Sequence, residues 1–232
     1  MKTIIKEEAK SGLIESVRIP MGKAYLEGEL GIPPGARGVV LFAHGSGSSR
    51  HSPRNQFVAR TIRESGTGTL LFDLLTGEEE IEDNITARLR FDIGLLARRL
   101  VEVTHWLTRR PETQRYGVGY FGSSTGGGAA LVAAAELGKS IGAVVSRGGR
   151  PDLAGDALPR VQSPTLLIVG GRDDVVIQLN EEALAKLHCE KELKIVPRAT
   201  HLFEDPGALE EVARLAADWF RRHLQLRPQT TR

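Results

Sequence analysis

The sequence predicts an α/β protein with a mostly parallel central sheet and helices on both of its faces. Short, wholly apolar runs, such as residues 39–43, are typical of strands buried on both sides of a parallel sheet. Segments with helical periodicity alternate with these runs, and this alternation favours helices that cover both faces. Glycine is abundant, with 26 residues in a chain of 232, and many glycines follow an apolar run where a tight turn is needed.

The expected elements follow one another in a regular order. Residues 16–19 and 24–30 are expected to be two edge strands, which form a hairpin joined at residues 20–23. The later strands are mostly apolar and are expected at residues 39–43, 69–72, 117–121, 142–145, 165–169 and 193–196. The helices are expected at residues 56–64, 91–107, 125–137, 179–187 and 207–224. The acidic stretch at residues 77–83 is interpreted as a loop.

The length suits one domain with a substantial core, since a chain of this size buries about 70–75% of its unfolded surface. Because the chain shows no linker, repeat or low-complexity segment, we expect residues 1–232 to form a single domain. The segment between the strands at 142–145 and 165–169 is short. It leaves no room for a large helical cap, so we expect an open site.

Composition argues against several classes of function. The 31 basic and 29 acidic residues nearly balance, and no basic stripe carries interleaved aromatic residues, so we expect no nucleic-acid partner. No run of 18 apolar residues exists, which argues against a membrane partner. Residues 1–8 carry acids and lack an apolar core, so we expect no targeting peptide and a cytoplasmic protein.

The cysteine count and the spacing of possible metal ligands give no sign of a disulfide, a metal or another cofactor. Cys189 is the single cysteine, which excludes an internal disulfide framework, and a structural role is the simplest interpretation. No cluster of His, Cys and Asp has the spacing of a metal site, so we expect neither a metal nor another cofactor. The chain gives no strong evidence on assembly, and we expect a monomer or a small homo-oligomer.

The most informative motif is Gly-Ser-Ser-Thr-Gly at residues 122–126, which follows the apolar run at 117–121. It matches the G-x-S-x-G nucleophile elbow, in which a serine lies at the apex of a sharp turn from strand to helix. The turn forces strained backbone angles on Ser124, and Gly122 and Gly126 supply the small neighbours that such a turn requires. We therefore predict that Ser124 is a nucleophile.

A serine at neutral pH needs a general base and an acid that orients the base. His201 follows the last predicted strand and is the best candidate for the base, with His51 as a minor alternative. Asp173 and Asp174 follow an apolar strand, and spacing favours Asp173, with Asp174 as the fallback. The acid that does not serve the histidine is interpreted as a turn or helix-cap residue.

The loop after the strand at residues 39–43 begins with His44-Gly45-Ser46-Gly47 and is the candidate oxyanion loop. We expect one oxyanion donor to be the backbone N–H of Thr125 and the other to be that of Ser46. A glycine turn that binds phosphate is the alternative interpretation, but neither phosphate-loop spacing is present.

Substrate contacts are expected from loops on the same rim as the serine. His44 and the loop at residues 50–55 belong to this group. Arg147 and Arg150 are candidates to bind a carboxylate or another anionic part of a substrate. The alternative is that these arginines pair with local acids such as Asp152 and Asp156.

The order Ser124…Asp173…His201, the elbow and the His44-Gly45 loop together resemble the α/β-hydrolase superfamily, and the compact capless form resembles its dienelactone hydrolase-related group. The resemblance extends from about residue 16 to residue 224. It implies an α/β-hydrolase fold without a large cap domain. Classical dienelactone hydrolase is known for a cysteine nucleophile, whereas this chain has Ser124 at that position. A serine favours ordinary ester hydrolysis.

These observations predict a serine hydrolase that acts on carboxylic esters of small or medium-sized molecules. Thioester or amide cleavage, acyl transfer and perhydrolysis use the same triad and remain alternatives. A hydrolase fold that only binds a ligand, or an accessory domain that depends on a partner, is the alternative of another class.

Overall fold

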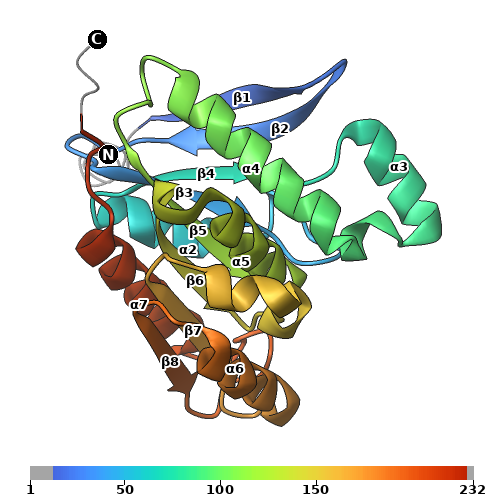
Figure 1. Ribbon diagram of the computed structural model, residues 1–232, viewed down its shortest axis with the longest axis vertical. Helices are drawn as coiled ribbons and strands as arrows, with labels where there is room; N and C mark the ends of the chain where they lie inside the picture. Colours follow the sequence, from blue (N-terminus) through green and yellow to red (C-terminus); the bar gives the residue numbers. More distant parts are fainter. Residues whose placement is uncertain (1–12, 229–232) are drawn as a thin grey trace.

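The computed structural model describes residues 13–228, and its strands form one sheet in the order β1-β2-β4-β3-β5-β6-β7-β8 (Figure 1). The predicted absence of a targeting peptide concerns residues 1–8, which lie outside the described residues. The strand bounds are β1 Ile14–Met21, β2 Ala24–Gly31, β3 Gly38–Ala43, β4 Gly68–Phe72, β5 Gly117–Ser123, β6 Ile141–Arg147, β7 Thr165–Gly170 and β8 Lys191–Val196.

The sheet is parallel except at one side. β1 pairs antiparallel with β2, and β2 pairs antiparallel with β4, whereas the six strands β4, β3, β5, β6, β7 and β8 run parallel to one another. The expectation that both hairpin strands are edge strands was wrong for β2, because residues 28–31 of β2 pair with residues 69–72 of β4. Strands β3 to β7 are almost entirely buried, as their apolar sequences predict.

Helices cover both faces of the sheet, which confirms the predicted fold class. α4 (Ile93–Arg109), α5 (Thr125–Leu137) and α6 (Asp174–Lys186) lie on one face together with the 3₁₀ segment η3 (Pro151–Arg160). The other face holds α2 (Pro53–Glu64) and α7 (Ala208–His223), which pack on each other. The short 3₁₀ segments η1 (Leu89–Phe91) and η2 (Gly138–Ser140) connect elements on the first face.

The acidic stretch that was expected to be a loop is instead the helix α3, Gly77–Thr86. Thr76 caps this helix by accepting from the Glu79 amide, and the Glu79 side chain accepts in return from the Thr76 amide. Acidic residues in the first turn also stabilise a helix, because they lie near the positive end of its dipole. The run of acidic residues therefore marks the start of a helix and not a loop.

Two other helices begin earlier than the sequence predicts. α2 begins at Pro53 and not at residue 56, because proline is well tolerated in a first turn and Ser52 caps it. α6 begins at Asp174 and not at residue 179. Both helix starts therefore move toward the ends of the preceding strands.

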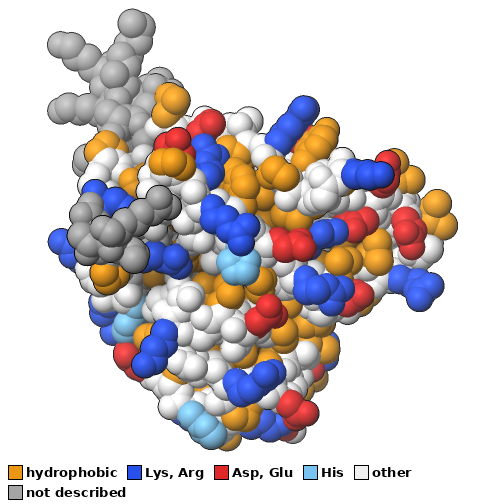
Figure 2. Space-filling view, turned by 45° about the horizontal axis from the view of Figure 1, so that its top comes forward, with side chains coloured by type: hydrophobic (Ala, Val, Ile, Leu, Met, Phe, Trp, Pro, Cys, Tyr) orange, Lys and Arg blue, Asp and Glu red, His pale blue; other side chains and the backbone are white. Residues whose placement is uncertain are grey.

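The carboxyl ends of the parallel strands meet at one rim, where an open α/β sheet normally binds its ligands. The segment between β6 and β7 holds only η3, so no large cap covers this rim. In the view of Figure 2, acidic and basic side chains are interspersed and do not form a patch of one sign. Within residues 13–228, none of the helices combines the length and the apolar character that crossing a membrane requires.

Candidate active site

Ser124 lies at the turn between β5 and α5 with φ 48° and ψ −122°, a strained conformation for a residue with a side chain. The turn is tight on both sides. A Cβ atom on Gly122 would lie 2.5 Å from the carbonyl oxygen of Gly126, and one on Gly126 would lie 2.2 Å from the carbonyl oxygen of Ala43. Glycine is therefore required at both positions, and the elbow presents Ser124 at the rim.

His201 and Asp173 come from two different strand ends and meet. His201 follows β8, Asp173 follows β7, and His201 Nδ1 lies 2.6 Å from Asp173 Oδ2. Asp173 is also the N-cap residue of α6, but its side chain makes no capping hydrogen bond there. The neighbouring Asp174 is exposed on the first turn of α6. The carboxylate of Asp173 is thus used by the histidine and not by the helix.

Ser124 and His201 line the same small pocket, which has a volume of about 270 Å³. The remaining lining residues come from the loop after β3, from the start of α2, from the ends of β5 and β6, and from the residue after His201: Gly45, Ser46, Ser48, Ser52, Arg54, Asn55, Ser123, Arg147 and Leu202. We call this the serine pocket. It brings together the predicted nucleophile and the predicted base.

The loop after β3 packs directly against the elbow. A Cβ atom on Gly45 would lie 3.2 Å from the Cβ atom of Ser124, so this loop lies at the serine. The Ser46 amide donates a 3.0 Å hydrogen bond to Thr125 Oγ1. Within the described residues, no hydrogen bond is found for the Thr125 amide, which lies in the first turn of α5. The two predicted oxyanion donors therefore lie next to each other, with the Ser46 amide already engaged.

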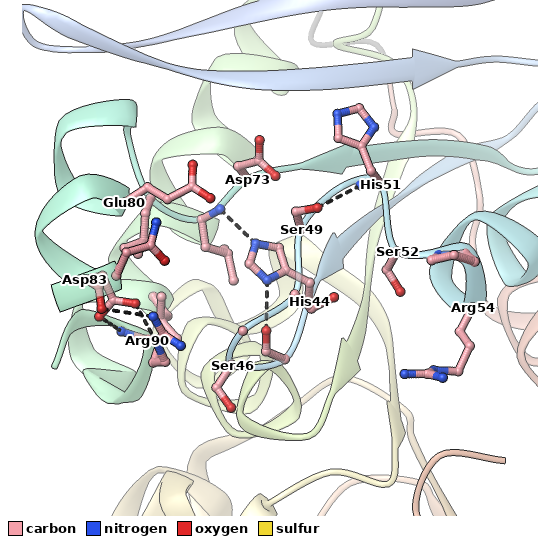
Figure 3. Close-up of a pocket in the computed structure, with 18 residues that line it drawn as sticks. His44, Ser46, Ser49, His51, Ser52, Arg54, Asp73, Glu80, Asp83 and Arg90 are labelled. Atoms are coloured by element: carbon pink, nitrogen blue, oxygen red, sulfur yellow. Dashed lines mark hydrogen bonds and ion pairs between the residues drawn. The ribbon is translucent and has the colours of Figure 1, made fainter. Parts of the chain in front are cut away.

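His44 lines a neighbouring, larger pocket and not the serine pocket, and it supports the loop after β3 (Figure 3). Its Nε2 accepts from the Leu74 amide at 3.2 Å, and its Nδ1 lies 3.0 Å from the Gly45 carbonyl oxygen. These contacts fit the neutral tautomer that carries the proton on Nδ1. Burial lowers the pKa of His44, which also favours the neutral ring. Both nitrogens are thus occupied by backbone groups.

A second and larger pocket, of about 600 Å³, lies on the other side of the His44 loop. Figure 3 shows that its wall is formed by the loop after β3, by the end of β4 and by α3. Its lining includes the carboxylates of Asp73, Glu80 and Asp83. We call it the acidic pocket. It shares Gly45, Ser46, Ser48, Ser52 and Arg54 with the serine pocket.

The structure separates the two arginines that were candidates for substrate binding. Arg147 lines the serine pocket and is 7% exposed, and it makes no ion pair with a described residue. Arg150 makes a two-bond ion pair with Asp152, with distances of 2.8 and 2.7 Å, and lies outside both pockets. Local pairing, the alternative expected from the sequence, therefore describes Arg150 and not Arg147.

The contacts of Arg147 were not identified from the sequence, although Asn55 belongs to the loop at residues 50–55 that was expected at this rim. Asn55 and Ser123 are buried and bind Arg147, and Phe203 packs under the Arg147 guanidinium at 5.7 Å. The residue types alone gave no signal for these roles. The position of Ser123 at the end of β5, beside the end of β6, is the one feature that points to its contact with Arg147.

No group of three or more His, Cys, Asp or Glu residues in the described part of the chain is arranged to hold a metal ion. Cys189 is a half-buried thiol, near the start of β8 and away from the serine pocket, and burial raises its pKa. A raised pKa keeps a thiol protonated and poorly nucleophilic. Cys189 therefore does not join Ser124, His201 and Asp173 at this rim.

Comparisons with known proteins support the fold and indicate a family. The model of the dienelactone hydrolase family matches residues 26–229. A solved structure of a dienelactone hydrolase from Anabaena variabilis ATCC 29413 is 60% identical, covers 93% of this chain and 100% of its own, and superposes with a TM-score of 0.91. Est1E from Butyrivibrio proteoclasticus is 16% identical, with 89% of this chain and 98% of its own covered, and its TM-score of 0.74 shows a shared fold.

Curated relatives carry a different kind of name. Two Mycobacterium tuberculosis proteins, from strains CDC 1551 / Oshkosh and ATCC 25618 / H37Rv, are each named "Putative phosphoribosyl transferase" and are 57% identical over 211 residues. That alignment covers 90% of this chain but 46% of each relative. The chain thus spans about half the length of these proteins.

Proposed function

Because the chain belongs to the dienelactone hydrolase family, we propose that it is a serine hydrolase that cleaves carboxylic esters of small or medium-sized molecules. The family and the fold support a hydrolase. What we propose beyond this is Ser124 as the nucleophile and a carboxylic ester as the bond that is cleaved. The observation that carries it is the pocket in which Ser124, on a strained elbow, lies with His201, whose other ring nitrogen is held by Asp173.

The contact between His201 and Asp173 supports a separate role for each ring nitrogen of the histidine. Asp173 Oδ2 binds Nδ1 at 2.6 Å, which leaves Nε2 to accept the proton of Ser124. Ser124 Oγ then attacks the carbonyl carbon, and the histidine returns the proton to the departing alcohol. A water molecule activated by the same nitrogen releases the acyl group from Ser124. Asp173 stabilises the imidazolium ion that forms in each half of the cycle.

The tetrahedral intermediate needs donors for its oxyanion. The Thr125 amide is the first, since it lies in the first turn of α5, where the helix dipole adds positive potential. The Ser46 amide is the second, and it exchanges or shares its bond to Thr125 Oγ1 when the oxyanion forms. Loss of one such donor typically costs about 3–4 kcal/mol of transition-state stabilisation.

The transferase name of the curated relatives is not extended to this chain. The chain spans 46% of those proteins, and the 211 aligned residues cover most of the region that the hydrolase family model recognises. We assign the hydrolase chemistry to the described residues alone. Thioesters, amides and acyl acceptors other than water are separated from simple esters by a substrate panel with competing nucleophiles.

The test is covalent labelling by a fluorophosphonate probe, read by peptide mass spectrometry. We expect one adduct on Ser124 in the wild type, none in Ser124→Ala and much slower labelling in His201→Ala. His188→Ala is the matched control, because His188 is exposed and lies outside the serine pocket. A folded wild-type protein that neither labels at Ser124 nor hydrolyses a short-chain ester would refute the proposal and favour a protein that only binds a ligand.

A further inference from the structure

Arg147 is a buried cation without a carboxylate partner. It ends β6, is 7% exposed and forms no ion pair with any residue in the range 13–228. Its Nη2 donates to Ser123 Oγ at 2.9 Å and to Asn55 Oδ1 at 3.4 Å, and its Nε is buried without a hydrogen-bond partner. Burying an uncompensated charge is costly, so such residues usually serve a ligand or a counter-ion.

A second arginine faces the same pocket. Arg54 lines the serine pocket from the first turn of α2, and its only ion pair in the described chain is a 3.8 Å contact with the exposed Glu204. Burial, together with the nearby charge of Arg54, lowers the pKa of Arg147 to about 10. Arg147 therefore stays protonated at neutral pH, and the charges of both arginines belong to the lining of one pocket.

The start of α2 adds further positive potential. This helix has 12 residues, begins at Pro53 after the N-cap Ser52, and has no acidic residue in its first turn. Helix N-termini favour anions because their first amides have no acceptor in the helix. In α2 the Arg54 amide is the first-turn donor that remains, because Pro53 has no N–H and the Asn55 amide donates to Ser52 Oγ. The hydroxyl groups of Ser48 and Ser52 line the same pocket and can also donate.

The adjoining acidic pocket provides a contrast. Its lining includes Asp73, Glu80 and Asp83, whereas no carboxylate is found among the residues that line the serine pocket. Two of the acidic pocket's carboxylates are already paired with arginines, since Arg50 pairs with Asp73 and Arg90 pairs with Asp83. Arg54 lines both pockets, whereas Arg147, the buried arginine without an ion pair among the described residues, lines the serine pocket alone.

We propose that Arg147, Arg54 and the first turn of α2 form a phosphate subsite, and that the ester cleaved at Ser124 belongs to a molecule that carries a phosphate monoester. This substrate class rests on the proposed ester hydrolysis. Two guanidinium groups, two hydroxyl groups and a helix terminus supply donors from several directions, which matches a tetrahedral dianion. A carboxylate can also accept from two guanidinium groups, but its single charge neutralises one of them, whereas the two charges of a phosphate monoester match both.

The first experiment measures binding without turnover. Inorganic phosphate is titrated into Ser124→Ala by calorimetry, alone and combined with Arg54→Met, Arg147→Lys or Arg60→Met. We expect phosphate to bind to Ser124→Ala, and Arg54→Met and Arg147→Lys each to weaken binding by about tenfold or more, as expected for lost charge-assisted hydrogen bonds. Arg60 is the matched control, because it is exposed on the same helix and lies outside the pocket.

Arg54 is only half-buried, so Arg54→Met is expected to fold even if Arg147→Lys does not. The melting temperatures of all variants are compared to check this. Equal phosphate affinity in the control and in Arg54→Met and Arg147→Lys would overturn the subsite. Binding of acetate in preference to phosphate, abolished by the same two substitutions, would also overturn it and assign a carboxylate instead.

The second experiment uses a matched pair of esters, butyryl glycerol and butyryl glycerol phosphate. The wild type is expected to favour the phosphorylated ester in kcat/KM, and Arg54→Met to lower that ratio by about tenfold. A wild type with no preference would overturn the substrate class. Phosphate binding that depends on both arginines, without hydrolysis of either ester, would refute ester hydrolysis while keeping the phosphate subsite, so the two proposals fail separately.

Discussion

At the scale of single residues, the two adjacent aspartates after β7 differ in what their carboxylates contact. Asp173 contacts His201 Nδ1, whereas Asp174 is exposed on the first turn of α6. Asp173 occupies the N-cap position but makes no capping bond, so its carboxylate is available to the histidine. The sequence placed both acids correctly after a strand, and the direction of the α6 turn decides between them.

The expected effect of Asp173→Asn is a loss in kcat of up to about 10⁴-fold, because the amide stabilises the wrong histidine tautomer. Asp174→Asn, the matched control, is expected to leave kcat close to that of the wild type. Both variants are compared by steady-state hydrolysis of a short-chain ester. If the large loss occurred in Asp174→Asn and not in Asp173→Asn, the assignment of the orienting acid would be reversed.

For Arg147 and Arg150, the sequence alone does not decide between ligand binding and local ion pairing. Both follow the same strand and both are arginines near local acids, so the sequence left binding and pairing open for each. The register of β6 against β5 brings Arg147 next to Ser123, while Arg150 lies in the loop beside Asp152. Tertiary register, which short sequence patterns do not encode, separates them.

At the scale of elements, α3 is the segment that the sequence interpretation missed. Asp83 is its single buried residue, so the helix has no apolar stripe that periodicity could reveal. Ile81 and Ile85 are 68% and 84% exposed. In Figure 1 the helix stands away from the sheet, beyond the start of α4. The capping box at Thr76 and Glu79 was the available signal, and it identifies the start of a helix without a buried face.

Asp83 anchors α3 to the following segment. Its carboxylate accepts from the Leu89 amide at 2.7 Å, from the Arg90 amide at 3.0 Å and from Arg90 Nε at 2.6 Å. Loss of hydration acts to raise the pKa of Asp83, but hydrogen bonds from Arg90 and Leu89 prevail and hold it below the ordinary value of 3.8. The anchor is therefore fully present above pH 3.8 and is lost as the pH falls through the lowered pKa.

We expect Asp83→Asn to loosen α3 and η1 at neutral pH, because the amide loses one acceptor and the charge that Arg90 binds. Hydrogen exchange, corrected for intrinsic rates, should accelerate at residues 77–91 and remain unchanged in β5. In the wild type the same acceleration should appear only below pH 3.8. Glu82→Gln is the control, because Glu82 is exposed on the same helix. Wild-type exchange in Asp83→Asn would show that α3 does not depend on this anchor.

At the scale of the whole molecule, the sequence predicted the layered sheet well, because buried parallel strands are continuous apolar runs. Residues 39–43 and 117–121 show this most clearly, since every residue of β3 and β5 is buried. The prediction that Ser124, Asp173 and His201 lie at one rim followed from the topology, since all three come after parallel strands. Contacts between distant loops, such as the Ser46 amide with Thr125 Oγ1, required coordinates.

The core cluster on the α2 and α7 face and the lining of the serine pocket consist of different residues. Trp219 on α7 is fully buried in the core cluster on the α2 and α7 face, and its Nε1 donates to the Pro164 carbonyl oxygen at 3.3 Å. Neither pocket is lined by Trp219. Removing this side chain should therefore weaken the core without changing the groups at the rim.

Trp219→Ala is expected to cost about 3–5 kcal/mol, the usual cost of a large cavity in a core. In a protein of this size each kcal/mol lowers the melting temperature by roughly 2–4 °C, so a fall of about 6–20 °C is expected in thermal unfolding. At 20 °C, well below that transition, kcat for a short-chain ester should stay within about twofold of the wild type, because the strand ends that carry the site remain in place. A large loss of kcat in a variant that is still folded at this temperature would show that the α7 core positions the site, and that the two faces of the sheet are coupled.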